Sequence, residues 1–525
     1  MNDTPGLTTP VADAANGRPL DKLRSIDELS AITREAQATG ATVVLAHGTF
    51  DLIHIGHLRH LRQARAEGSM LLVTITADAF VTKGPGRPVF SKRMRAEMLA
   101  ALECVDFVGI QHAPKAIDAI RTIRPDVYAK GSDYKNPDDD VTGGIVEERN
   151  AVEAHGGRIA FTEDVTFSSS SLINRHLSVF DPTLDEFLEA QREKDVLGPL
   201  LELLDRVKDY RVLMVGDAII DDYHYVSAMG KSPKETMIAT LFHDREVFAG
   251  GVFAAANHAA NFCREVEVVT TIGDDYEYER LIRESLKPNV RLYAFRRSGV
   301  PTTRKTRFID RSYLRKLFEV YDMDDTPTAA NVERQIDRII RDRADEFDVV
   351  VVADFGHGLL TPSMIATLNG TARFLAVNAQ SNSANLGYNL ITKYARADYV
   401  CIDAPEARLA VSDRFSGIEE IASDALPQRI DCSRFMITHG RWGCVGYAIG
   451  QDVVHVPAFT KTVVDTVGAG DAFFAVTAPL AAAGGAIDQL GFIGSAAGAI
   501  KVGIVGHRAS VERVPLVKFL TTLLK

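Results

Sequence analysis

The stretch Thr42-Val-Val-Leu-Ala-His-Gly-Thr-Phe-Asp-Leu-Ile-His-Ile-Gly-His57 decides the fold of the first part of this chain. It begins with an apolar, β-branched run typical of a buried strand and continues through a glycine-containing turn into a helix. A strand that enters a helix in this way directs backbone N–H groups and the helix dipole at one point, which makes an anion site. His54 and His57 lie three apart on the first helical turn and can face the same phosphate, and Gly56 lets a nucleotide approach the backbone closely.

Strand-like apolar runs alternate with helical patterns on both sides of this stretch. Before it, the capping box Ser25-Ile-Asp-Glu28 begins a helix that Gly40 ends. Alternation of this kind predicts a parallel sheet with helices on both of its faces. We expect the strands at residues 42–46, 70–76, 105–110, 126–129 and 158–161, and the later helices near 57–67, 91–102, 115–123 and 144–155.

A second decisive stretch, Asp465-Thr-Val-Gly-Ala-Gly-Asp471, precedes an apolar helical pattern near the end of the chain. The small residues Gly468, Ala469 and Gly470 leave consecutive N–H groups unobstructed at a helix start, which makes an anion hole for a phosphoryl group in transfer. Asp471 lies in the first turn, where the dipole favours its ionised form, and it can accept a proton from an attacking hydroxyl. The plainer interpretation is a glycine turn with capping aspartates.

The first stretch resembles the cytidylyltransferase-like nucleotidylyltransferase superfamily, whose signature is a GxFDxxHxGH run. The resemblance covers residues 22–178 and includes runs similar to the adenylyltransferase half of bacterial ADP-heptose synthases. It implies that His54 and His57 stabilise the α-phosphate, and that nucleotide or phosphate contacts come from Gly48, Thr49, Phe50, Lys83, Arg93, Lys130, Ser168, Ser169 and Ser170.

Each of these residues also has a plainer interpretation. The histidines can be capping or surface residues, the basic residues can be solvated charges, and the serine run can be an N-cap. Asp51 can simply brace the turn, so its role stays open. The tetrapeptide His54-Ile-Gly-His57 is also the signature of class I aminoacyl-tRNA synthetases, but no KMSKS-like loop follows it and the net charge is wrong for tRNA.

The second stretch resembles the signature of the ribokinase-like (PfkB) sugar kinases, and the similarity covers residues 211–525. The resemblance implies that Asp471 is the catalytic base. It assigns the ATP side to Thr438, Gly440 and Gly443, and it associates Glu406 with phosphates and Mg²⁺. Lys305 and Arg307 lie where heptose kinases have a basic pair, which suggests contact with a sugar phosphate. The other residues implied to bind the sugar are Asp217, Asp221, Gly250, Gly251 and Asp465.

Three departures from the kinase pattern leave the identity of the sugar open and, less strongly, bear on activity. Ala254 stands where the family has an asparagine after its diglycine, and an asparagine follows only at Asn257. Asp403 replaces the asparagine of an Asn-x-x-Glu motif. Residues 378–380, Asn-Ala-Gln, stand where heptose kinases have Asp-Pro-Lys. Kinases that have lost activity usually lack the base, whereas Asp471 is present.

Composition limits the class of protein. At 525 residues the chain is too long for one hydrophobic core. Its net charge of −11, from 59 basic and 70 acidic residues, argues against nucleic-acid binding. The five cysteines are scattered without a CxxC pair, which predicts neither a disulfide framework nor a zinc site. Without a signal pattern or a membrane span, we expect a cytoplasmic protein with small-molecule partners; a homodimer is carried over from the kinase family alone.

The expected fold class is α/β in two parts, a Rossmann-like nucleotidylyltransferase domain over residues 21–178 and a ribokinase-like domain over 211–525. Residues 1–20 read as a disordered tail. Between the domains, an amphipathic helix from Leu184 to about Tyr210, interrupted at Gly198-Pro199, is either a spacer or a packing helix.

The leading hypothesis is a bifunctional enzyme that makes a nucleotide-activated sugar of the ADP-heptose type. The kinase half would use Mg²⁺ and ATP to phosphorylate a sugar, and the other half would join a sugar 1-phosphate to a nucleotide with release of pyrophosphate. The domain order is the reverse of that in ADP-heptose synthases. One alternative is a cytidylyltransferase for another sugar or polyol phosphate fused to a kinase of different preference. Another is a kinase-like half that only binds its ligand.

Overall fold

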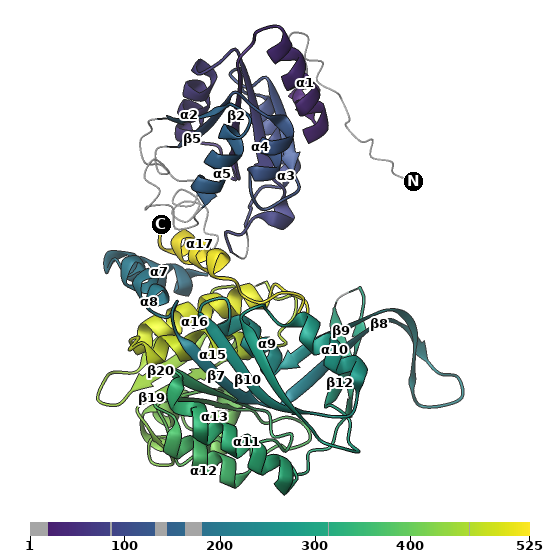
Figure 1. The fold of residues 1–525 in the computed structure, drawn as a ribbon, viewed down its shortest axis with the longest axis vertical. Coiled ribbons are helices and arrows are strands. Elements are labelled where there is room, and N and C mark those ends of the chain that lie inside the picture. Colours follow the sequence, from purple (N-terminus) through teal and green to yellow (C-terminus); the bar gives the residue numbers. More distant parts are fainter. Residues whose placement is uncertain (1–18, 85–86, 132–143, 163–180, 313, 461) are drawn as a thin grey trace, which may run out of the picture. The chain divides into compact units, whose positions relative to one another are not determined.

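The computed structural model describes residues 19–84, 87–131, 144–162, 181–312, 314–460 and 462–525 (Figure 1). Contacts within the chain divide it into two compact units. The first consists of Met1–Thr82 and Arg87–Leu177, and the second consists of Lys83–Gly86 and Ser178–Lys525. Ser168, Ser169 and Ser170, for which we predicted phosphate contacts, lie outside the described residues.

Within the described part of the first unit, six parallel strands form a sheet in the order β1-β4-β3-β2-β5-β6. The expected parallel sheet is confirmed. The strands are β1 (Leu23–Arg24), β2 (Val43–Gly48), β3 (Met70–Thr76), β4 (Phe107–Gln111), β5 (Val127–Gly131) and β6 (Arg158–Thr162). The helices are α1 (Ile26–Ala38), α2 (Ile55–Ala66), α3 (Lys92–Ala100), α4 (Ile117–Ile123) and α5 (Gly144–Glu153).

Alternate residues of β2 supply two separate cores, because successive side chains of a strand point to opposite faces of the sheet. Val44 and Ala46 pack in a cluster with residues of α2 and α3. Val43 and Leu45 pack in another cluster with residues of α1, α4 and α5. Both faces of the sheet are therefore covered by helices, and the apolar part of β2, residues 43–46, is fully buried.

The described part of the second unit contains a sheet of nine strands, in the order β11-β10-β7-β14-β15-β17-β19-β20-β21. Neighbouring strands from β11 to β19 pair in parallel, whereas β20 pairs antiparallel with both β19 and β21. The bounds are β7 (Arg211–Gly216), β10 (Glu265–Ile272), β11 (Val290–Arg296), β14 (Val349–Asp354), β15 (Leu375–Ala379), β17 (Tyr399–Asp403), β19 (Arg434–Thr438), β20 (Cys444–Ala448) and β21 (Val454–Val456).

Helices cover both faces of this sheet too (Figure 1). Val212 and Met214 of β7 belong to one core cluster, and Leu213 and Val215 belong to the other. The first cluster includes residues of α7 (Pro182–Glu193), α8 (Leu197–Arg206), α9 (Val252–Ala259), α10 (Tyr276–Ser285), α15 (Ala469–Ala482), α16 (Ile487–Lys501) and α17 (Arg513–Leu524). The second includes residues of α11 (Ala330–Arg343), α12 (Pro362–Thr371), α13 (Ala404–Val411) and α14 (Ile418–Glu420).

Helices α7 and α8 pack on the second unit. Leu188 and Leu203 are fully buried in its first core cluster. The break between the two helices falls at residues 194–196, just before the expected Gly198-Pro199. Pro199 lies in the first turn of α8, where a missing backbone N–H costs no helical hydrogen bond.

The second unit also has a smaller sheet that the sequence analysis did not predict. Its order is β13-β12-β8-β9, with β8 (Ala218–Lys231), β9 (Ile238–Gly251), β12 (Arg304–Asp310) and β13 (Arg315–Asp322). β8 and β9 form a long antiparallel hairpin, and β12 lies parallel to β8. A further short pair joins β16 (Arg396–Ala397) to β18 (Asp431–Cys432).

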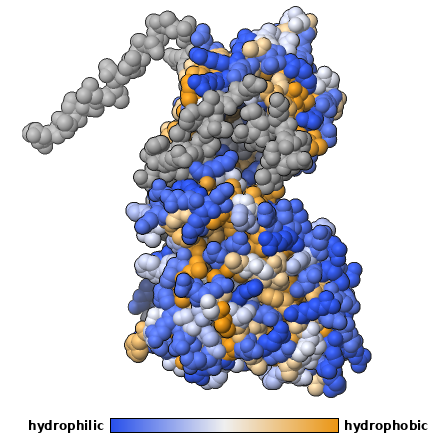
Figure 2. All heavy atoms as spheres, turned by 90° about the vertical axis from the view of Figure 1, so that its left-hand side faces the viewer, coloured by the Kyte–Doolittle hydropathy of each residue, from blue (hydrophilic) through white to orange (hydrophobic). Residues whose placement is uncertain are grey.

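The surface view in Figure 2 shows mainly hydrophilic residues, with apolar ones in small groups. In the part of the chain that the structure describes, no helix combines the length and the apolar character needed to cross a membrane.

Candidate active sites

The histidine stretch lies where the strand order of the first unit reverses. From β2 the chain continues to β3 and β4 on one side of the sheet, and then to β5 and β6 on the other. In open α/β sheets, ligands bind at the carboxyl ends of the strands at such a reversal. Residues 47–57 leave the carboxyl end of β2, and Lys130 lies near the end of the neighbouring β5. The fold thus brings these predicted residues to one edge of the sheet.

The two histidines lie side by side. Their rings stack with centroids 4.0 Å apart, and the Phe50 ring meets His57 edge-on at 5.0 Å. His54 is also the N-cap of α2, because its Nδ1 accepts a hydrogen bond of 3.1 Å from the Gly56 N–H. The geometry therefore agrees with both interpretations: the two imidazoles are paired, and His54 also caps the helix.

Three buried side chains that we had not assigned hold the turn in place. Asp51 accepts a hydrogen bond from the Phe90 N–H at 3.1 Å and pairs with Arg87 at 3.4 Å. Arg95 is fully buried and donates to the carbonyl oxygens of Thr49 and, at 2.8 Å, Thr76. Asp51 thus braces the turn, and Arg95 fixes the backbone of a predicted nucleotide contact.

His47, near the end of β2, connects this strand to the neighbouring β3. Burial, with a smaller effect of the Lys130 charge, lowers the pKa of His47 to about 3, so the imidazole stays neutral. Its Nδ1 lies 2.9 Å from the Thr74 hydroxyl and its Nε2 lies 3.2 Å from the Thr76 hydroxyl. A neutral ring held by two hydroxyls in this way fixes the end of the strand.

The other residues predicted for the first site differ in their surroundings. Lys130 is largely buried and forms an ion pair of 2.5 Å with Glu148. Arg93 has 78% of its side chain exposed and pairs with Glu97 one helical turn away. Lys83 belongs to the segment Lys83–Gly86, which groups with the second unit and not with the histidine pair.

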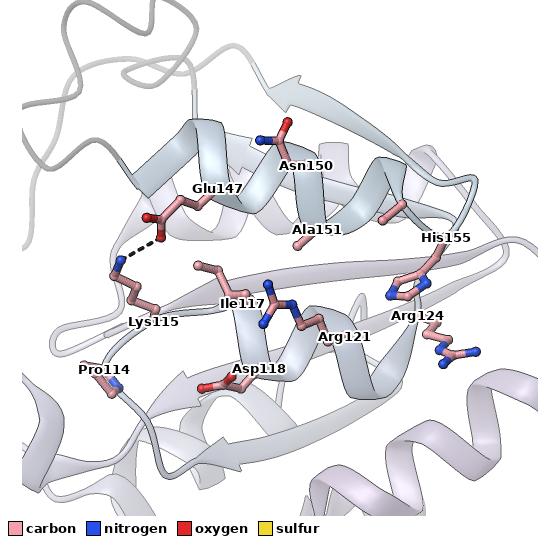
Figure 3. A pocket seen from close by; sticks show the side chains of 11 residues that line it. Pro114, Lys115, Ile117, Asp118, Arg121, Arg124, Glu147, Asn150, Ala151 and His155 are labelled. Atoms are coloured by element: carbon pink, nitrogen blue, oxygen red, sulfur yellow. Dashed lines mark hydrogen bonds and ion pairs between the residues drawn. The ribbon is translucent and has the colours of Figure 1, made fainter.

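A groove of about 830 Å³ lies between α4 and α5 of the first unit (Figure 3). Lys115 and Glu147 form an ion pair of 2.6 Å at one end, and His155 lies at the other. None of the residues predicted to contact nucleotide lines this groove. It is therefore separate from the candidate site at the end of β2.

The strand order of the second unit reverses between β7 and β14, and Asp217 follows β7 at that point. Asp217 is 3% exposed and accepts hydrogen bonds from the backbone N–H groups of Phe355 at 2.9 Å and Leu359 at 3.2 Å. Burial and the nearby charge of Asp354 raise the pKa of Asp217 to about 6. In this structure Asp217 organises the loop after β14.

Asp221 lies on β8 between Arg307 and His507. Arg307 pairs with one of its oxygens, and His507 Nε2 lies 3.0 Å from the other. Burial alone would raise the pKa of Asp221, but these two partners lower it. Gly250 has no room for a side chain, because a Cβ would lie 2.0 Å from Asp221 Oδ2. The diglycine and the aspartate motif therefore form one packed unit.

The predicted basic pair is present beside Asp221. Arg307 also pairs with Glu319 at 3.2 Å, so two carboxylates already hold its guanidinium. Lys305 is 7% exposed, and its ammonium lies over the Tyr321 ring at 5.3 Å. Burial lowers the pKa of Lys305, while the Asp221 charge raises it.

The glycine-rich loop forms the N-terminus of α15, as its sequence predicts. Gly468 is the N-cap, with a φ of +74°, and a Cβ there would lie 2.7 Å from Cε1 of His507. His507 thus contacts both Asp221 and the turn before Asp471. A Cβ at Gly470 would meet nothing within 4 Å, so packing does not account for the small residue there.

Asp465 and Lys501 form hydrogen bonds with the backbone of the loop that precedes α15. The Asp465 carboxylate accepts hydrogen bonds from Tyr223 Oη and Lys316 Nζ, both at 2.8 Å, and from the backbone N–H groups of Val467 and Gly506. The Asp465 carboxylate would have to give up or share some of these four hydrogen bonds to contact a substrate as predicted. Lys501 is fully buried and donates to the carbonyl oxygens of Val467 at 2.7 Å and Gly506 at 2.8 Å. The sequence analysis missed Lys501, whose only signal is a lone charge in an apolar helix.

Asp471 lies in the first turn of α15 and is partly exposed. Its Oδ1 accepts a hydrogen bond of 2.6 Å from Gln380 Nε2. Burial raises the pKa of Asp471, and the charge of His507 and the hydrogen bond from Gln380 partly offset this shift.

Glu406 lies in the first turn of α13 and forms a reciprocal capping box with Asp403, the N-cap of that helix. Each backbone N–H donates to the other side chain at 2.8 Å, and the Ser381 N–H donates to Glu406 Oε1 at 3.1 Å. Burial and the charge of Asp403 raise the pKa of Glu406 to about 8. Thr438 ends β19, and Gly440 and Gly443 form the turn into β20.

The residues that depart from the kinase pattern have local partners. Ala254 is buried in α9. Asn257 donates to the Ser285 carbonyl at 2.9 Å and accepts from the Lys287 N–H, so it ties α9 to the end of α10. The Asn378 side chain donates to the Cys401 carbonyl at 2.7 Å.

Comparisons with known proteins cover both units. The model of the pfkB family carbohydrate kinases matches residues 210–513, and the Cytidylyltransferase-like model matches residues 45–176. The Bifunctional protein HldE of Methylobacillus flagellatus is 41% identical over 160 residues, which are 30% of this chain and 31% of that protein. The protein of the same name from Syntrophotalea carbinolica is 35% identical over 163 residues, 30% of this chain and 32% of its own length. These matches thus span about a third of each relative.

The solved structures that are similar to the chain include two bacterial proteins. Phosphofructokinase-2 from Escherichia coli in complex with potassium has a TM-score of 0.49 and 13% identity, and the match covers 60% of this chain and 100% of that one. The ribokinase of Thermotoga maritima has a TM-score of 0.46 and 20% identity, with coverage of 59% and 99%.

Proposed function

Because this chain belongs to the pfkB family of carbohydrate kinases, we propose that its second unit transfers the γ-phosphoryl group of ATP to a sugar hydroxyl. The observation that carries the proposal is the start of α15, where a glycine N-cap and Asp471 share one helical turn. His507 links that turn to Asp221, which the resemblance assigns to the sugar. A base, an anion hole and an acceptor site are therefore adjacent.

The chemistry follows from this arrangement. The acceptor hydroxyl loses its proton to Asp471 as its oxygen bonds to the γ-phosphorus, and the bond between that phosphorus and the β–γ bridging oxygen breaks to release ADP. The N–H groups at residues 468–470 stabilise the charge of the phosphoryl group in transfer. Asp471 must be ionised at this moment, although burial raises its pKa.

Mg²⁺ fits beside Glu406. Two adjacent carboxyl groups, of which Glu406 is buried with a pKa raised to about 8, would be stabilised in their ionised forms by a divalent cation. Among the described residues no group of three or more His, Cys, Asp or Glu side chains could hold a metal. Phosphates of the nucleotide would therefore supply the remaining ligands, and the bound ion would neutralise phosphate charge.

For the first unit we propose nucleotidylyl transfer. A sugar 1-phosphate oxygen attacks the α-phosphorus of the triphosphate, and the bond to the pyrophosphate leaving group breaks. The stacked His54 and His57 lie at the start of α2, where imidazole N–H donors and the helix dipole would converge on the α-phosphate. The attacking phosphate is already an anion, so this step needs no strong base.

The resemblance of the motifs to those of ADP-heptose synthases supports heptose as the sugar and ADP-heptose as the type of product, and the relatives named Bifunctional protein HldE agree with two activities in one chain. With heptose 7-phosphate as the first substrate, a separate phosphatase would act between the two steps, because the kinase product carries two phosphates. The test incubates the full chain with ATP and heptose 7-phosphate, and in parallel supplies heptose 1-phosphate with ATP or CTP.

Mass spectrometry should then show a heptose bisphosphate in the first reaction, and pyrophosphate with ADP-heptose in the second. Pyrophosphate release with CTP alone would contradict adenylyl transfer and favour a cytidylyltransferase. Failure to consume ATP with any member of a sugar panel would contradict the kinase assignment and favour a unit that only binds its ligand.

A further inference from the structure

Gln380 contacts the predicted base of the kinase site from a neighbouring strand. It directly follows β15, and the Asp354–Ala379 pairing aligns the ends of β14 and β15 at the same edge of the sheet. Its Nε2 lies 2.6 Å from Asp471 Oδ1. Since an ionised carboxylate only accepts hydrogen bonds, the amide must donate in this contact.

The backbone around Gln380 is fixed on both sides. Its own N–H donates to the Asp354 carbonyl at 2.8 Å, and its carbonyl accepts from Asn389 Nδ2 at 3.0 Å. The next N–H, that of Ser381, donates to Glu406. Asn389 is itself bonded to the Asp354 carbonyl and side chain. The backbone of Gln380 is therefore fixed, and only its side-chain torsions remain to be ordered when its amide holds a carboxylate.

We infer that Gln380 is a positioning residue for the base of phosphoryl transfer, an inference that rests on the proposed kinase function. Its amide holds Oδ1 of Asp471 and thereby leaves Oδ2 to accept the proton of the sugar hydroxyl. A hydrogen bond donated to the ionised form also favours ionisation of the Asp471 carboxyl group, whose pKa is raised by burial.

The other groups that act on Asp471 have opposing effects. The positive charges of His507 and Lys501 favour its ionised form, and the charge of Asp221 disfavours it. Asp471 also interacts electrostatically with Lys305, Glu406 and Cys401. Because a substitution of Gln380 leaves all these groups in place, the difference between a variant and the wild type reports on the amide.

The experiment measures kcat for phosphorylation against pH with the full chain and saturating Mg²⁺ and ATP. Gln380→Met keeps the length of the side chain and removes the donor. Gln380→Glu keeps its shape and replaces the donor with a second acid. The matched control is Gln428→Met, because Gln428 Nε2 donates to Asp424 Oδ1 at 2.9 Å in an equivalent but exposed contact.

We expect the acidic limb of the Gln380→Met profile to move up by about one pH unit, as for the loss of one hydrogen bond to a charged carboxylate. The acidic limb of the Gln380→Glu profile should move to still higher pH, because the new carboxyl group and that of Asp471 would share a proton. Gln428→Met should superimpose on the wild type. Thermal unfolding of each variant shows whether it is folded, and Gln380→Glu provides the comparison if Gln380→Met is not.

Limbs that coincide with the wild type in the folded Gln380 variants would overturn the inference alone, as would a fall in kcat without a shift of the limb. A wild-type chain that phosphorylates no sugar would overturn the proposed function, and the inference with it.

Discussion

His54 has two roles in the first site, and one substitution can separate them. Its Nδ1 caps α2, and its ring stacks on His57. His54→Ala removes both roles and should cost about 0.5–2 kcal/mol of stability, as for the loss of an N-cap. His54→Asn restores a capping oxygen but no imidazole. Both variants should lower the rate of pyrophosphate release by about 10²–10³-fold, as for the loss of one charge-stabilising group.

Chemical denaturation and a pyrophosphate assay on the two variants check this prediction. His54→Asn should unfold at the same denaturant concentration as the wild type and yet remain slow. If His54→Asn releases pyrophosphate at the wild-type rate, the His54 imidazole has no role in nucleotidylyl transfer and the residue acts only as the N-cap of α2.

If Mg²⁺ binds beside Glu406 as proposed, its effect on stability should depend on pH. Its raised pKa means that the proton stabilises the folded apoprotein, and this contribution is lost as pH rises from about 4.5 to about 8. A cation that binds the ionised form should therefore stabilise the protein more at pH 8 than at pH 6. We expect the increase in melting temperature on addition of Mg²⁺ and ATP to grow over this range, and Glu406→Gln to reduce the growth. An increase that is the same at both pH values would contradict the placement of Mg²⁺.

Several residues that shape the two sites were not predictable from the sequence. Arg95, Lys501 and His507 are charged or polar residues that sequence reasoning places on the surface, yet each is buried by partners far away in the chain. Lys501, for example, bonds carbonyl oxygens that only the tertiary fold brings together. The motif residues themselves were predictable, because short motifs encode helix starts and tight turns locally.

At the scale of elements, the loop before α15 depends on a lysine at the end of α16. Lys501→Met removes the donor shared by the Val467 and Gly506 carbonyls and a positive charge near the start of α15, where we propose the anion hole. We expect sugar phosphorylation to fall by at least about tenfold, the equivalent of 1.4 kcal/mol, while pyrophosphate release by the first unit is unchanged. Lys208→Met is the matched control, because Lys208 pairs with Asp205 on the surface of the same unit.

Parallel ATP-consumption and pyrophosphate assays measure both effects. Full kinase activity of a folded Lys501→Met variant would contradict this prediction and show that the loop before α15 does not need the Lys501 ammonium group.

Elements with a clear period or cap were predicted well. The strand expected at 70–76 has those bounds, and the helix after Ser25 has the reciprocal capping box. The hairpin of β8 and β9 was missed. β8 begins fully buried and ends fully exposed, so its sequence shows neither a steady alternation nor a continuous apolar run. The small sheet that carries Asp221, Lys305 and Arg307 therefore appears only in the tertiary structure.

At the scale of the whole molecule, the chain combines two α/β units, each with its candidate site at a reversal of strand order. The matches to curated relatives span about a third of their length. The resemblance to known proteins therefore supports the two types of reaction more strongly than it supports the identity of the sugar substrate. In the proposed acceptor site, Asp221 and Arg307 already have charged or polar protein partners, so a bound sugar would have to share or replace these contacts.

The central claim is that one chain carries two independent sites for chemistry at phosphorus. The most direct measurement compares both activities in the full-length variants Asp471→Asn and His57→Ala. Asp471→Asn should lower phosphorylation by about 10²–10⁴-fold, as for the loss of a general base, and leave pyrophosphate release at the wild-type rate. His57→Ala should do the reverse. Full phosphorylation by Asp471→Asn, or a parallel loss of both activities in either folded variant, would contradict the account.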